Sequence, residues 1–181
     1  MASAAALSGE ARHLVMRFVW SLRVEAPDEA DEAMLVALLS PEELALYQAQ
    51  PLADRAHSVA CAVAIRNDPT VRPTRDLLVA SALHDVGKAD TALGTPGRVA
   101  ATLFGVVVGR RRTARWLEWR GPVGRMARYR HHDERGARML EAAGSSPLVV
   151  AWALEHHLEA DQRSIEAHLA AALRRADEAA A

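Results

Sequence analysis

The chain has 181 residues, of which half are hydrophobic and a quarter are charged. This composition can bury a hydrophobic core and excludes wholesale disorder, and the length suits one globular domain better than two. The formal net charge of −1 leaves no global basic surface of the kind that nucleic-acid binding demands.

Cellular location can be predicted from three further features. Cys61 is the only cysteine, which excludes an intramolecular disulfide and is typical of a reducing compartment. The N-terminus has no basic start ahead of a long apolar run, so no secretory signal is expected. The longest strongly apolar stretch, residues 99–108, is about half of the ~20 residues that a membrane-spanning helix requires. We therefore expect a cytoplasmic protein.

The pattern of residues predicts helices throughout. Thirty-eight alanines against two phenylalanines favour closely packed helices over a sheet, and no segment has the alternation of a strand. Helices are predicted, in chain order, at residues 10–22, from Pro41 behind the cap Ser40, at 51–65, 75–86, 123–143 and 147–157, and from 164 to the C-terminus. The predicted fold is an all-α bundle of five or more helices. An acidic helical section (1–50) packs on a main domain (51–181) that contains a basic helical insertion at about 91–130.

The basic insertion differs in charge from the rest of the chain. Residues 91–130 hold nine arginines and one acid, Glu118. The stretch 98–130 can be a solvated helical hairpin or a funnel for a phosphate-rich substrate. With Phe104, Trp116 and Trp119 it can also be a peripheral contact with an anionic membrane surface or a partner. Nucleic acid is the fourth alternative, although no recognised binding motif accompanies the charge.

The histidines are concentrated on apolar helix faces. Each position can be tested by its neighbours three, four and seven residues away, which share its face. This test places six histidine and aspartate side chains inward: His57, His84, Asp85, His132, His156 and His157. It also places Asp177 on the apolar stripe of the last helix, and it predicts that His131, among arginines and Glu134, faces solvent.

A metal centre explains this set of polar side chains. Burying them without partners would cost several kcal/mol each, whereas imidazole and carboxylate ligands suit Fe, Mn, Zn or Co. Adjacent ligands on one helix diverge by about 100°. Pairs such as His84-Asp85 and His156-His157 therefore suit two neighbouring metals, or one metal and a supporting role, better than joint capture of one ion.

The ordered motifs resemble the HD superfamily of metal-dependent phosphohydrolases. The resemblance covers roughly residues 51–178. It is carried by the strings 54–58 (DRAHS), 82–88 (ALHDVGK), 132–137 (HDERGA), 152–157 (WALEHH) and 175–177 (RAD). These strings are similar to the dinuclear branch of the superfamily, but Leu158-Glu159-Ala160-Asp161 replaces the Gly-Tyr-Pro element that follows in the branch cleaving cyclic di-GMP.

The resemblance implies a ligand set and an activity. One metal would take His57, His84, Asp85 and Asp177, with Asp161 as the alternative final ligand; the second would share Asp85 and take His132, His156 and His157. Two divalent transition metals, Fe or Mn before Co or Zn, would supply a metal-activated hydroxide that attacks a small phosphorylated substrate such as a nucleotide. Lys88, the single lysine beside 21 arginines, would contact the phosphate or assist the leaving group and, with Asp85, form the catalytic pair. The alternatives are a non-catalytic metal-binding or regulatory module and, within the same superfamily, a di-iron oxygenase.

Overall fold

The protein is described by a computed structural model that covers residues 26–91 and 108–180, together with residues 93, 97, 100, 101 and 104. These residues form nine α-helices, three short 3₁₀ helices and no β-strand, so the predicted all-α class is confirmed. The predicted helix at 10–22 lies outside the described residues.

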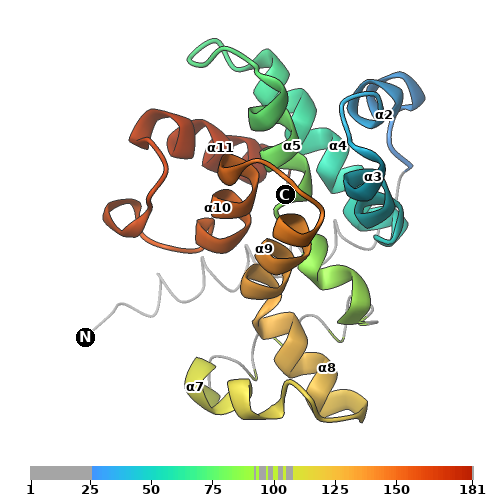
Figure 1. Ribbon diagram of the computed structural model, residues 1–181, viewed down its shortest axis with the longest axis vertical. Helices are drawn as coiled ribbons and strands as arrows, with labels where there is room; N and C mark the ends of the chain where they lie inside the picture. Colours follow the sequence, from blue (N-terminus) through green and yellow to red (C-terminus); the bar gives the residue numbers. More distant parts are fainter. Residues whose placement is uncertain are drawn as a thin grey trace, which may run out of the picture.

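Figure 1 shows the described helices coloured in chain order, from blue to red. The α-helices are α2 (Glu29–Val36), α3 (Pro41–Gln48), α4 (Leu52–Asn67), α5 (Arg75–Leu83), α7 (Arg110–Thr113), α8 (Gly121–Arg130), α9 (His132–Ala142), α10 (Pro147–Glu155) and α11 (Ala167–Ala179). The 3₁₀ helices are η1 (Val86–Thr91), η2 (Ala114–Trp116) and η3 (Ala160–Gln162).

Side-chain hydrogen bonds cap the first turns of two helices, α3 and α5, whose starts the sequence predicts. At α3 the Ser40 hydroxyl accepts a hydrogen bond from the Glu43 amide at 3.1 Å, while the Glu43 carboxylate accepts one from the Ser40 amide at 2.9 Å. This reciprocal pair satisfies two amides that the first turn leaves without partners. At α5 the Thr74 hydroxyl accepts from the Leu77 amide at 3.3 Å. Both starts confirm the sequence prediction.

Helix α5 forms the centre of the bundle and packs against α4, α10 and α11 (Figure 1). All of its residues from 77 to 83 are buried, and small side chains at Ala80, Ser81 and Ala82 allow its neighbours to approach closely. Trp152 of α10, 1% exposed, is the largest side chain of the core and brings α10 against α5. The core thereby fixes the C-terminal ends of α5 and α10 close together.

The structure corrects several predicted boundaries. The continuous helix predicted at 123–143 is divided at His131, whose φ of −112° and ψ of 26° are not helical. The physical reason is that the His131 side chain, 2% exposed, turns inward and pairs with the Thr113 hydroxyl at 3.1 Å. Helix α4 extends two residues beyond its predicted end at residue 65. Helix α5 ends at Leu83, and a 3₁₀ helix follows where its last turn was predicted. Helix α11 begins at Ala167 and not at the predicted residue 164. The sequence did not predict α2.

The acidic section contributes to the core where it is described. Leu35 of α2 and Tyr47 of α3 are at most 1% exposed and belong to the central cluster. The buried Glu43 carboxylate receives hydrogen bonds from Arg75 of α5 at 2.5 Å and from the Ser145 hydroxyl at 2.8 Å. Among the described residues, none of the helices combines the length and the hydropathy that crossing a membrane would require.

Candidate metal centre

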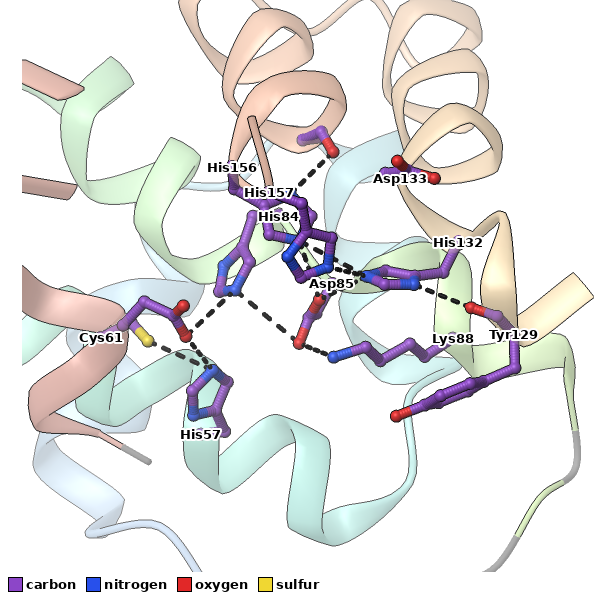
Figure 2. Close-up of polar contacts among 12 residues, drawn as sticks. His57, Cys61, His84, Asp85, Lys88, Tyr129, His132, Asp133, His156 and His157 are labelled. Carbon is purple, nitrogen blue, oxygen red and sulfur yellow. Dashed lines mark hydrogen bonds and ion pairs between the residues drawn. The ribbon is translucent and has the colours of Figure 1, made fainter. Parts of the chain in front are cut away.

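The side chains that the sequence predicts as metal ligands converge on one place inside the bundle. They come from five helices: His57 from α4, His84 and Asp85 from the end of α5, His132 from the start of α9, His156 and His157 from the end of α10, and Asp177 from α11. Figure 2 shows the histidines and Asp85 pointing toward one another. The cluster therefore depends on where the helices end, which the core packing decides.

The first half of the cluster joins α4, α5 and α11. The Asp177 carboxylate oxygen Oδ1 lies 3.3 Å from His57 Nε2 and 3.5 Å from His84 Nε2. His84 is 1% exposed, and Asp177 is partly exposed. Asp161, the alternative final ligand, is exposed on η3. The structure thus brings Asp177 to the two histidines, at a distance that a shared ion would span.

The second half of the cluster consists of three imidazoles. His132 Nε2 lies 3.4 Å from His156 Nε2 and 3.2 Å from His157 Nε2. His132 and His156 are each 6% exposed, whereas His157 is exposed. The three nitrogens face a common point, and His157 forms the side that is open to solvent.

Asp85 lies between the two halves. Its Oδ1 is 3.3 Å from His132 Nε2 and 3.7 Å from His156 Nε2, while its Oδ2 is 3.7 Å from His84 Nε2. Oδ1 is buried and has no hydrogen-bond partner among the described residues. A buried carboxylate oxygen without a partner is costly, and a cation between Asp85 and the histidines would satisfy it.

Hydrogen bonds to the backbone determine which nitrogen of each ring faces the cluster. The Nδ1 of His84, His132 and His156 donates to the carbonyl oxygen three residues earlier, at 2.8, 2.8 and 2.9 Å. A carbonyl only accepts, so Nδ1 carries a proton in each ring and Nε2 is the nitrogen that faces the cluster. This is the orientation in which histidines bind metals.

The spacing of these atoms matches a metal site. His132 Nε2 lies 3.2 to 3.4 Å from the Nε2 atoms of both His157 and His156, while the Nδ1 atoms of His132 and His156 already donate to carbonyl oxygens. Ligand atoms about 2.0–2.1 Å from a tetrahedral Zn²⁺ lie ~3.3 Å apart. The distances from Asp177 and Asp85 to their nearest imidazoles are also 3.3 Å. The cluster can therefore hold metal ions.

The protonation states are those of metal ligands. Burial, reinforced by His84, lowers the pKa of His156 to about 2, and burial with His132 lowers the pKa of His157 to about 4. Burial opposes the charge of Asp177, but hydrogen bonds with His57 and His84 outweigh it and lower its pKa. Neutral histidines beside ionised carboxylates are the set that binds a divalent cation.

His57 differs from the other histidines in protonation. Burial opposes its charge, but the hydrogen bond with Asp177 outweighs burial and raises its pKa well above the usual value. Its Nδ1 donates to the Ala180 carbonyl at 3.2 Å, so the additional proton is on Nε2, toward the cluster. A metal ion bound there would displace that proton.

Lys88 lies at the edge of the cluster. Its ammonium group contacts Asp85 Oδ2 and lies 6.0 Å from the centre of the Tyr129 ring. Burial opposes the ammonium charge, but Asp85 outweighs burial and raises the pKa of Lys88. Burial likewise opposes the Asp85 charge, and Lys88 outweighs it and lowers the pKa of that carboxyl. The lysine is thus a fixed positive charge beside the central carboxylate.

Two expectations about single residues need revision. His131, predicted to face solvent, is buried beside Thr113, and burial with Arg110 lowers its pKa. Cys61, not predicted as a site residue, lies with its Sγ 3.5 Å from His57 Nε2. The signal for Cys61 is present in the sequence, because it follows His57 by four residues and shares its helix face.

The described part of the basic insertion lies next to the cluster. Arg110 forms ion pairs of 2.8 Å with Asp133 and Glu134, in the first turn of α9. Further along, a groove of about 470 Å³ is lined by Arg120, Arg125, Arg128 and Arg135 and by Leu117, Glu118, Trp119 and Gly121. No residue of this groove is one of the clustered histidines or aspartates, so the two features are distinct.

The chain was compared with family models, curated proteins and solved structures, and the function of the site has to be inferred from its residues. No family model matches the chain, and neither a curated protein nor a solved structure matches it.

Proposed function

We propose that this chain is a metal-dependent phosphohydrolase of the HD superfamily, which uses two divalent metal ions to cleave a phosphoester of a small phosphorylated substrate. The observation that carries the proposal is that His132 Nε2 lies within 3.4 Å of the Nε2 atoms of His156 and His157 and 3.3 Å from Asp85 Oδ1. That oxygen is buried and has no hydrogen-bond partner among the described residues. The order of these ligands along the chain is that of the superfamily.

Each half of the cluster would hold one metal. His57, His84 and Asp177 would hold the first, and His132, His156 and His157 the second, with one Asp85 oxygen directed to each half. Two ions in such a site supply an activated water as nucleophile and neutralise charge on the attacking and leaving oxygens. Fe, Mn, Co and Zn all accept these ligands.

The chain's own residues would orient the substrate. Lys88 would pair with a phosphate oxygen from its position against Asp85, because a compact ammonium binds phosphate as a point charge. The substrate would enter past His157, the exposed member of the cluster. Asp85 would keep Lys88 charged and in place, since the two side chains contact each other directly.

Elemental analysis tests the metal site. The full chain, loaded with Mn²⁺ or Fe²⁺ without oxygen and then freed of excess metal, should retain close to two ions per chain. Asp85→Asn should lose at least one of them. His168→Ala should lose none, because His168 is an exposed histidine of α11 whose ion pair is with Glu166. A wild-type chain that retains no metal would contradict the proposal.

A phosphoester screen of the same samples tests the reaction. Nucleotides, cyclic dinucleotides and p-nitrophenyl esters should release product only with the loaded chain, and Asp85→Asn should release none. Full metal content without turnover on any phosphoester would instead favour a metal-binding regulatory module.

A further inference from the structure

The first half of the cluster contains a thiol in addition to imidazole and carboxylate groups. Cys61 follows His57 by one turn of α4 and is completely buried. Its sulfur lies 3.5 Å from His57 Nε2. The ligand atoms of His57, Cys61 and His84 all lie within 4.8 Å of one another, and Figure 2 shows the Cys61 sulfur directed toward the His57 ring.

An independent observation indicates that a cation belongs beside this thiol. His84 donates its Nδ1 proton to the Ser81 carbonyl, so its Nε2 is the nitrogen that faces the carboxylate oxygens of Asp177 and Asp85, at 3.5 and 3.7 Å. His84 is 1% exposed, so these contacts lie inside the bundle. Asp85, which shares this group with His84, has a buried Oδ1 without a hydrogen-bond partner among the described residues, and a cation in the cluster would satisfy such an atom.

The separation between sulfur and nitrogen also fits a shared metal. With bond lengths of about 2.3 Å to sulfur and 2.0–2.1 Å to nitrogen, the two ligand atoms of a tetrahedral site lie ~3.6 Å apart. The Cys61 sulfur and His57 Nε2 are 3.5 Å apart. The other explanation is a weak hydrogen bond that His57 Nε2 donates to the Cys61 sulfur, without a metal.

We propose that Cys61 is a thiolate ligand of the metal in the first half of the cluster, together with His57, His84 and Asp177. This inference rests on the proposed metal site and adds a ligand to it. When the metal binds, the thiol releases its proton to solvent and its sulfur forms the bond to the metal.

The sulfur ligand makes the two halves of the cluster chemically different. A thiolate favours Zn²⁺, Fe²⁺ or Co²⁺ and disfavours Mn²⁺ or Mg²⁺, whereas the three imidazoles and one carboxylate oxygen of the second half accept a wider range. In a mixture of Zn²⁺ and Mn²⁺, the first half should therefore retain Zn²⁺.

Cobalt substitution tests the sulfur bond directly. The full chain loaded with Co²⁺ under reducing, anaerobic conditions should show an intense near-ultraviolet band from sulfur-to-cobalt charge transfer. Cys61→Ser should lose this band, while the visible bands of cobalt bound by nitrogen and oxygen remain. His168→Ala, whose exposed imidazole lies elsewhere, should keep the whole spectrum.

The outcomes separate this inference from the proposed function. Two bound cobalt ions without the near-ultraviolet band would refute Cys61 as a ligand and leave the metal site standing, whereas no bound cobalt would overturn both. X-ray absorption of the unaltered zinc-loaded chain provides a second test if Cys61→Ser fails to fold. A sulfur neighbour at about 2.3 Å supports the inference, and a shell of nitrogen and oxygen alone overturns it.

Discussion

Replacement of Gly87 by alanine should separate the two halves of the metal centre, because this glycine of η1 packs directly against the backbone of α9. A Cβ atom on Gly87 would lie 2.0 Å from the His132 carbonyl oxygen and 2.7 Å from the Gly136 nitrogen. Real Cβ atoms almost never approach closer than 3.0 Å. The start of α9, which carries His132, must therefore move by about 1 Å or more.

The size of the effect follows from this displacement. Asp85 lies two residues before Gly87, and its Oδ1 is 3.3 Å from His132 Nε2. A movement of about 1 Å directed away from Asp85 would extend this distance to about 4.3 Å, beyond the ~3.3 Å between ligands of one metal. Overpacking costs about 1–3 kcal/mol, and because backbone atoms are the obstacle we expect about 3 kcal/mol. For a chain of this size that lowers Tm by about 6–12 °C.

Thermal denaturation and metal analysis of two variants test this reasoning. Gly136→Ala is the matched control, because its Cβ would lie 3.2 Å from the Gly87 nitrogen and 3.6 Å from the Gly87 Cα. We expect the control to lose less than about 1 kcal/mol and to retain its metal, while Gly87→Ala loses both stability and the second metal. If Gly87→Ala melts within about 2 °C of the unaltered chain and holds two metals, the contact between η1 and α9 is looser than the argument requires.

Three further predictions concern charge. Lys88→Gln should retain its metals but lower kcat on a phosphoester by roughly 100-fold or more, since it removes a preorganised positive charge; an unchanged kcat would limit Lys88 to balancing the charge of Asp85. The metal-free chain should lose stability as the pH falls below 6.5, because the unfolded chain then protonates His156 while the folded chain, with a pKa of about 2, does not. That residue alone contributes a loss of about 1 kcal/mol between pH 6.5 and 5.5, and about 1.4 kcal/mol for each further pH unit. Urea titrations at pH 6.5 and 5.5 that give equal stability would therefore contradict the burial of His156. The arginine groove should retain the protein on vesicles containing phosphatidylserine, with binding that falls as salt rises; Arg125→Gln should weaken it, and equal retention on neutral vesicles would exclude an electrostatic contact.

Much of the local structure was predictable because its causes are local. Ser40 and Glu43 cap a helix through atoms three residues apart, so a short string of sequence contains the whole interaction. The inward direction of His84 and His156 was also predictable, since apolar residues one turn away lie on the same helix face. The same argument from helix faces gave the wrong direction for the His131 side chain. It assumes one continuous helix, whereas the helix ends before His131 and a new one begins after it.

The sequence by itself determined that the chain is helical and that the candidate histidines and aspartates lie on apolar helix faces. It also determined which short motifs contain the candidate metal ligands. Only the tertiary structure decided that Asp177 rather than Asp161 approaches His57, and that Cys61 faces the same place. It also decided that Gly87 brings Asp85 within reach of His132. The physical reason is range: capping and helix periodicity act within a few residues, whereas the distance between two ligands on different helices depends on how every buried side chain between them packs.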